Sequence, residues 1–187
     1  IKSSAQDDWY RAMDFIQGVL DKYDTRDLPL FITETSVAIG TFQGSGTNAN
    51  MIGALGLADL LGAYRNSGVQ SVAIFGCIHN AATNWGLLYG VGEDRPPETP
   101  TPTYFILPIW TTSGNKVLNV TGIDRDVERL TLSSYASKKD DGSVQVVIIN
   151  KEAAPMDVGI SIDGIDIDGV PVDIYEMKPK NGSIVDK

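Results

Sequence analysis

One stretch of the sequence, residues 28–38, constrains the fold more than any other, because it has the composition of a buried strand and ends in a carboxylate. It reads Leu-Pro-Leu-Phe-Ile-Thr-Glu-Thr-Ser-Val-Ala, with no charged residue before Glu34. A continuous apolar run bounded by turn signals is typical of a parallel strand covered on both faces. In α/β proteins, ligands and catalytic groups gather at the C-terminal ends of such strands. Glu34 is therefore the first candidate for catalytic chemistry.

The residues around this strand alternate between helix and strand patterns. Apolar residues at helical spacing predict one helix over residues 7–23 and another over residues 51–64, the second closed by Asn66-Ser67-Gly68. The apolar stripe of the first helix is expected to pack against the core. Residues 69–76 form a second β-branched, apolar run. The order helix, strand, helix, strand predicts an α/β arrangement with a parallel sheet.

A long irregular segment over residues 77–102 follows the second predicted strand. A loop of this length after a strand is usually functional or disordered. Thr101-Pro102 resembles a helix start, so a short helix is expected to follow, with Pro108 kinking or ending it.

From about residue 115 the apolar period changes to two, which predicts a small antiparallel β-sandwich. The predicted strands cover residues 130–136, 143–150, 156–162 and 170–177, and Asp140-Asp141-Gly142 makes a hairpin turn between the first two. The expected domains are residues 1–114 and 115–187. Because two parallel strands with two or three helices cannot bury both faces of a sheet, we expect something outside this chain to complete the first 110 residues. The candidates are an N-terminal portion, a partner chain or a swapped copy.

Composition and charge exclude several classes of function. The net charge is −9 and neither half of the chain is basic, which argues against nucleic-acid binding but allows a neutral partner such as a sugar. Cys77 is the only cysteine, so an internal disulfide and a cysteine zinc cluster are excluded, and we expect a small buried residue there. The acidic turns at residues 163–168 lack a calcium-loop pattern and are expected to be solvated. No apolar run reaches the ~20 residues that span a bilayer, and we expect neither metal nor cofactor.

Several segments resemble the retaining clan A glycoside hydrolases. Ile32-Thr33-Glu34, the helix from Ala54 to Tyr64 and the run from Ser67 to Phe75 are similar to strand seven, helix seven and strand eight of their (β/α)8 barrels. Residues 132–138 and 141–151 resemble the β-sandwich that follows the barrel. The chain is most like glycoside hydrolase family 44, the endoglucanases and xyloglucanases. This resemblance implies the C-terminal part of a barrel, about two βα units, followed by the sandwich, in a secreted enzyme.

The resemblance also implies roles for individual residues. It makes Glu34 the nucleophile of a hydrolase acting on an oligosaccharide or polysaccharide such as β-glucan or xyloglucan. The partner acid/base of that family has no counterpart here, and Glu93 and Asp94 are only weak substitutes. Proton donation is therefore expected to come from outside this chain, and the isolated 187-residue chain is otherwise expected to be inactive. The candidate substrate-binding residues are His79, Asn80, Trp85 and Tyr89. Packing around the barrel mouth is an equal alternative for Trp85 and Tyr89, and a structural role is an alternative for His79. For Glu34 the alternative is an N-cap or loop carboxylate paired with an arginine.

Two other functions stay open at this point. One is an arabinofuranosidase-like or xylosidase-like glycosidase, since those families share the two-domain plan. The other is a non-catalytic carbohydrate-binding or structural module, in which the β-sandwich is the stable unit. The missing acid/base favours this second alternative.

Overall fold

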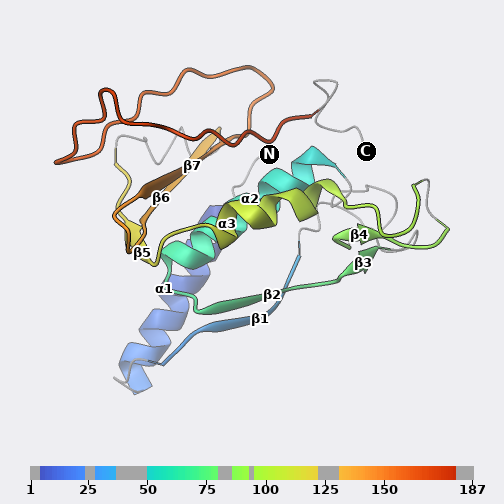
Figure 1. Ribbon diagram of the computed structural model, residues 1–187. Helices are drawn as coiled ribbons and strands as arrows, with labels where there is room; N and C mark the ends of the chain where they lie inside the picture. Colours follow the sequence, from blue (N-terminus) through green and yellow to red (C-terminus); the bar gives the residue numbers. More distant parts are fainter. Residues whose placement is uncertain are drawn as a thin grey trace.

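The computed structural model describes residues 5–23, 28–36, 50–79, 86–92, 95–121 and 131–179. Its elements are shown in Figure 1, and in chain order they are α1 (Ala5–Tyr23), β1 (Phe31–Thr35), α2 (Met51–Asn66), β2 (Ser71–Ile74), β3 (Ile78–His79), β4 (Leu88–Tyr89), the 3-10 helix η2 (Pro102–Ile106), α3 (Leu107–Thr111), β5 (Lys116–Leu118), β6 (Leu132–Lys138) and β7 (Val144–Asn150). The helix–strand–helix–strand order of the first part is confirmed.

Strands β1 and β2 are parallel neighbours and α2 connects them. Helix α2 begins at Asn50, whose side chain accepts a hydrogen bond from the Gly53 amide at 3.1 Å, as an N-cap does. It ends where Gly68 adopts a φ of 74°, a conformation that glycine reaches without strain. The sequence therefore encodes both ends of the crossover, and the predicted parallel pairing is confirmed.

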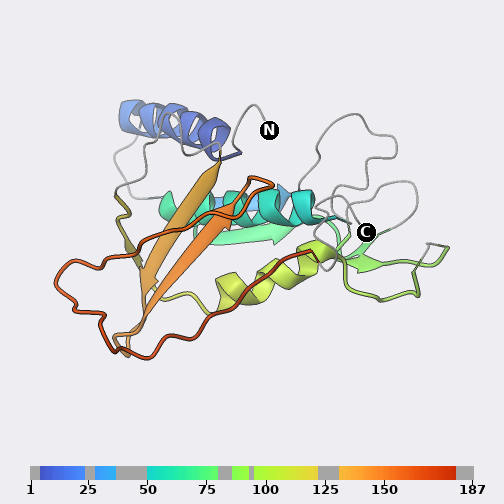
Figure 2. The same cartoon turned by 90° about the horizontal axis from the view of Figure 1, so that it is seen from above.

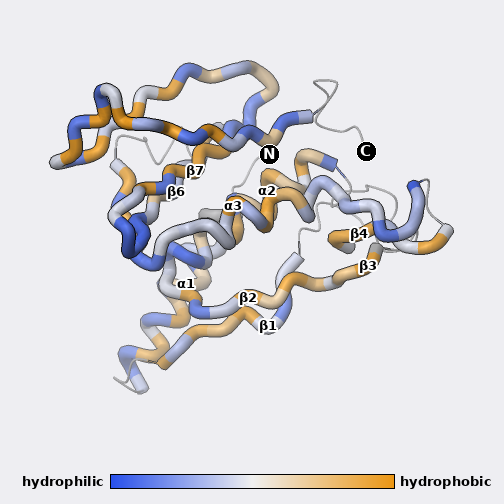
Figure 3. Tube along the Cα trace, viewed as in Figure 1, coloured by the Kyte–Doolittle hydropathy of each residue, from blue (hydrophilic) through white to orange (hydrophobic). Residues whose placement is uncertain are grey.

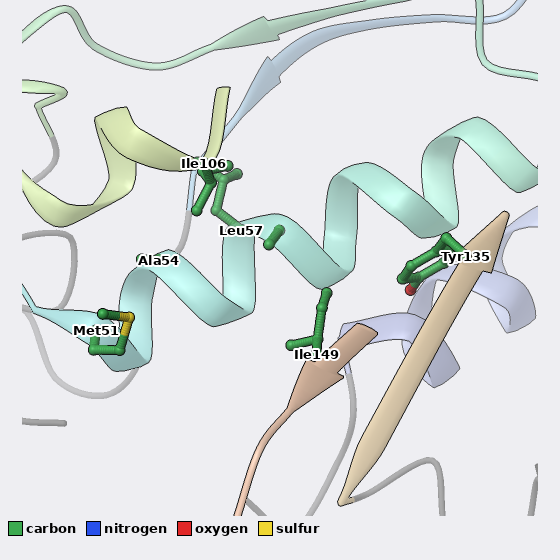
Figure 4. Packing of buried hydrophobic residues seen from close by; sticks show 7 residues of the cluster. Met51, Ala54, Leu57, Ile106, Tyr135 and Ile149 are labelled. Atoms are coloured by element: carbon green, nitrogen blue, oxygen red, sulfur yellow. The ribbon is translucent and has the colours of Figure 1, made fainter. Parts of the chain in front are cut away.

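Helix α2 is the centre of the core. Figures 1 and 2 show it between the β1–β2 pair and the strands β6 and β7, with η2 and α3 alongside. A helix covered on several sides must be apolar nearly all round, and α2 is. The buried apolar cluster of Figure 4 contains Met51, Ala54, Leu57, Ala58, Ile106, Tyr135 and Ile149. Residues from both predicted domains thus share one core.

Close packing against α2 depends on a glycine. A Cβ atom added at Gly62 would lie 2.5 Å from the ring of Tyr135. The Tyr135 hydroxyl also donates to the Asp59 carboxylate at 2.6 Å, and Lys151 forms an ion pair with the same carboxylate at 2.9 Å. These contacts fix the second sheet to α2 through buried polar groups as well as apolar ones.

The second sheet is antiparallel, in the order β5-β6-β7. At the predicted hairpin turn, the hydroxyl and the amide of Ser143 both donate to the Asp141 carboxylate, at 2.7 and 2.9 Å. These hydrogen bonds, the one from the hydroxyl first, lower the pKa of Asp141 below its ordinary value. The predicted hairpin is confirmed.

The prediction of two further strands at residues 156–162 and 170–177 was wrong, because these stretches form no ladder of backbone hydrogen bonds with a neighbouring strand. Figure 3 shows the alternating hydropathy that suggested them, but apart from a single bridge between Ile162 and Ile165 the described backbone here has no strand partner. Alternation makes a segment suitable for a sheet and does not supply a neighbour. The described residues therefore contain one three-stranded sheet, and the sandwich stays a prediction.

The short helix expected after Thr101-Pro102 is confirmed as η2, which ends at Ile106, two residues before Pro108. A separate helix, α3, then begins with Pro108 in its first turn, where proline is tolerated. Two smaller expectations need correction. The stripe of α1 packs incompletely, since Tyr23 is 74% exposed and Val19 is 40% exposed. Cys77 is exposed rather than buried.

Candidate functional site

Glu34 lies in a β-bulge of β1. Ile32 is in register with Val72, and Thr35 is in register with Ile74. Three steps along β1 therefore match two steps along β2, so Thr33 and Glu34 together oppose Ala73. One extra residue in one strand defines a bulge, and bulges often re-aim a side chain next to an active site.

The bulge decides which face of the sheet carries the carboxylate. Ile74 packs against the core around α2, so its register partner Thr35 shares the helix-covered face. Regular alternation from Ile32 would put Glu34 on that covered face. The extra residue shifts the phase, so that Thr35 is buried and Glu34 is exposed.

Thr35 has a specific partner beneath the sheet. Its hydroxyl and the hydroxyl of Tyr64 on α2 are 2.9 Å apart and buried. Its carbonyl accepts a hydrogen bond from the Phe75 amide at 2.8 Å, which closes the pairing of the two strands. The residue next to Glu34 is therefore held by both its side chain and its backbone.

The other face of the β1–β2 pair is open among the described residues. Phe31 is 54% exposed and Phe75 is 42% exposed, while Ala73 between them is small. Large aromatic side chains at this exposure offer apolar surface to a ligand or to a further strand. An exposed carboxylate next to apolar, aromatic surface is the main chemical feature of this region.

The other predicted site residues lie on or near β3 and β4. These short strands, unexpected within the segment 77–102, pair in parallel and put His79 opposite Tyr89. Tyr89 is buried, as a packing role requires. Asn80 and Trp85 lie outside the described residues, as do Glu93 and Asp94. Substrate binding by these residues stays a prediction.

Glu98 has an unusual backbone conformation that the sequence does not indicate. Its φ is 66°, a left-handed conformation that is uncommon for residues other than glycine. Its amide donates to the Tyr89 carbonyl at 2.7 Å while the Tyr89 amide donates to the Thr99 carbonyl at 2.8 Å, which makes a second bulge beside β4. No local pattern in the sequence signals this conformation, because it depends on pairing with a strand some ten residues earlier.

Other kinds of site find no support within the described ranges. No group of three or more metal-ligating side chains occurs among those residues. None of the described helices has the length and apolar character needed to cross a membrane. In comparisons with known proteins, no family model and no curated protein matches this chain.

Proposed function

We propose that this chain is the C-terminal part of a retaining glycoside hydrolase that acts on a plant-type polysaccharide such as β-glucan or xyloglucan, with Glu34 as the nucleophile. The observation that carries the proposal is the position of Glu34. Its carboxylate is exposed at the bulged, C-terminal end of a parallel strand, on the face turned away from α2. In α/β folds this end of the strand is where catalytic groups gather.

In the proposed reaction, the exposed Glu34 carboxylate is the nucleophile, and hydrolysis takes two steps. In the first step the Glu34 carboxylate attacks the anomeric carbon, the bond to the leaving oxygen breaks, and that oxygen takes a proton from a second carboxyl group. In the second step the same group removes a proton from water, and the water oxygen displaces Glu34 from the sugar. A retaining mechanism places the two carboxyl groups roughly 5–5.5 Å apart.

The second carboxyl group comes from outside this chain in our proposal. Among the described residues of β1, β2 and the turns at their ends, Glu34 is the only carboxylate. The open face beside Glu34 offers room for further strands, which would bring the acid/base to it. A sugar ring has apolar faces that suit the exposed Phe75, and its lack of charge fits an acidic protein.

A non-catalytic carbohydrate-binding module is the second candidate. The specific observation in its favour is the same lack of a second carboxylate on the β1–β2 pair. An arabinofuranosidase-like or xylosidase-like enzyme would use the same nucleophile on a different sugar. Activity assays on different glycosides therefore decide which sugar is the substrate.

The test compares the 187-residue chain with its Glu34→Gln variant on β-glucan, xyloglucan and dinitrophenyl glycosides. Dinitrophenolate is a good leaving group and needs little protonation, so the aryl substrates report on the nucleophile even when the acid is missing. Glu152→Gln, an exposed change just beyond β7, is the matched control.

We expect the unaltered chain and Glu152→Gln to release dinitrophenolate, and Glu34→Gln to lose this activity. Equal rates for Glu34→Gln and the unaltered chain would contradict the proposal. Binding of xyloglucan without any release from the aryl glycosides would favour the non-catalytic module.

A further inference from the structure

We infer that Tyr64 is the positioning residue for Glu34, acting through the hydroxyl of Thr35. Tyr64 does not touch the proposed reacting atoms. It holds the bulge in the phase that leaves the carboxylate exposed. The inference rests on the proposed function, because positioning matters for catalysis only if Glu34 is the nucleophile.

The hydroxyl of Thr35 is buried and needs a hydrogen-bond partner. The Thr35 residue is 6% exposed, and an unpaired hydroxyl at that depth destabilises the fold. The Tyr64 hydroxyl, 2.9 Å away in a residue that is also 6% exposed, satisfies it. This pair makes the bulged arrangement, with Thr35 inside, the favourable one.

A strand without the bulge would present a different side chain to α2. In a regular strand the side chain facing α2 would be Glu34, and Thr35 would be exposed. Moving the bulge by one residue therefore exchanges the two side chains between the faces. The hydrogen bond to Tyr64 is made only when Thr35 is inside, so it opposes this exchange and fixes the direction of Glu34.

Tyr64 is itself held firmly by contacts with α1 and α2. Its ring makes an edge-to-face contact with Trp9 of α1, with ring centres 4.4 Å apart and planes at 77°. The Trp9 indole donates to the Ser67 hydroxyl at 2.9 Å, and that hydroxyl donates to the Ala63 carbonyl at 2.9 Å. Helices α1 and α2 thus hold the Tyr64 side chain, and a residue that positions another must itself be fixed by packing and hydrogen bonds.

The test removes single hydroxyl groups while keeping the shape of the side chains. Tyr64→Phe and Thr35→Val delete the two partners separately, and the double variant deletes both. Tyr104→Phe, on η2 and 40% exposed, is the matched control. Two readouts are measured: the kinetics of covalent labelling by a dinitrophenyl 2-deoxy-2-fluoroglycoside, and NMR relaxation dispersion at the Thr33 and Glu34 amides.

We expect the maximal labelling rate to fall by about ten-fold or more in both single variants, because misplacing a reacting group slows the chemical step. The concentration of label giving half the maximal rate should stay within about two-fold, since binding is unaffected. The double variant should be no slower than either single variant, because all three lose the same hydrogen bond. A merely structural role would not produce this separation of rate from binding.

We expect relaxation dispersion at the Thr33 and Glu34 amides in Tyr64→Phe and Thr35→Val but none in the unaltered chain or Tyr104→Phe, because exchange of the bulge between two positions is slower than ps–ns motion. Flat dispersion profiles and unchanged labelling rates in Tyr64→Phe and Thr35→Val would overturn the inference. If the unaltered chain is not labelled at Glu34 while the dispersion still appears in the variants, the glycosidase proposal is wrong, but Tyr64 still holds the bulge.

Discussion

The buried ion pair between Asp59 and Lys151 gives the sharpest prediction on stability. It joins α2 to the end of β7, and its two side chains are 4% and 7% exposed. Replacing Lys151 with Met keeps the length and much of the apolar stem but removes the charge. The buried Asp59 carboxylate then loses its contact with the Lys151 ammonium, while Tyr135 still donates to it.

The expected cost follows from the separation and the burial. Two unit charges 2.9 Å apart attract by about 6 kcal/mol at an effective dielectric constant of about 20. Relaxation and water entry recover part of this, so Lys151→Met should lower the free energy of unfolding by about 3–5 kcal/mol. A domain is typically stable by only about 5–15 kcal/mol, so the loss would be large.

Urea denaturation followed by circular dichroism measures this change. Adding Asp59→Asn to Lys151→Met should restore part of the stability, because the neutral amide can still accept from Tyr135 and a buried negative charge is removed together with its Lys151 partner. The matched control is Lys178→Met, which breaks the ion pair between Lys178 and Glu176. These side chains are 70% and 62% exposed, so this substitution should lower the free energy of unfolding by less than about 1 kcal/mol. A cost below about 1 kcal/mol for Lys151→Met, or a double variant no more stable than it, would refute the reasoning.

Three further predictions can be checked on the same protein. Gly62→Ala should lower the melting temperature, because its methyl group would lie 2.5 Å from the Tyr135 ring and overpacking at about 1–3 kcal/mol outweighs about 1 kcal/mol of helix propensity. Glu98→Gly should raise the free energy of unfolding by up to about 1 kcal/mol by relieving a φ of 66°, and a clear loss of stability would contradict this. Ser143→Ala should raise the pKa of Asp141 towards its ordinary value in an NMR titration. The pKa of Asp141 is lowered in the folded state. Its contribution to stability is therefore complete at a pH above the ordinary pKa of an aspartate, and it is lost as the pH falls through the lowered pKa of the folded state.

Local patterns predicted the elements well and their neighbours poorly. Helical spacing of apolar residues correctly gave α1 and α2, and Asp140-Asp141-Gly142 correctly gave the turn between β6 and β7. The alternating stretches at 156–162 and 170–177 were misread, because alternation is compatible with a strand but pairing is decided by the rest of the fold. The short pair β3 and β4 was missed for the same reason.

At the candidate site, too, the sequence predicted a residue but not its surroundings. Position and composition alone singled out Glu34 at the end of a strand. The bulge that exposes it depends on the register of two strands about forty residues apart, and the hydroxyl pair depends on how Tyr64 on α2 meets Thr35. Pairings at such separations cannot be read from a local window, although each residue type fits its place once the fold is known.

Covalent trapping tests the central claim, that Glu34 is a glycosidase nucleophile, most directly. The 187-residue chain is incubated with a dinitrophenyl 2-deoxy-2-fluoroglycoside, in which the fluorine slows turnover of the glycosyl-enzyme and the leaving group needs little protonation. Peptide mapping by mass spectrometry then locates the sugar. We predict one fluoroglycosyl group, attached to Glu34 and absent from the Glu34→Gln variant. A label on another carboxylate, or no label at Glu34, would contradict this assignment.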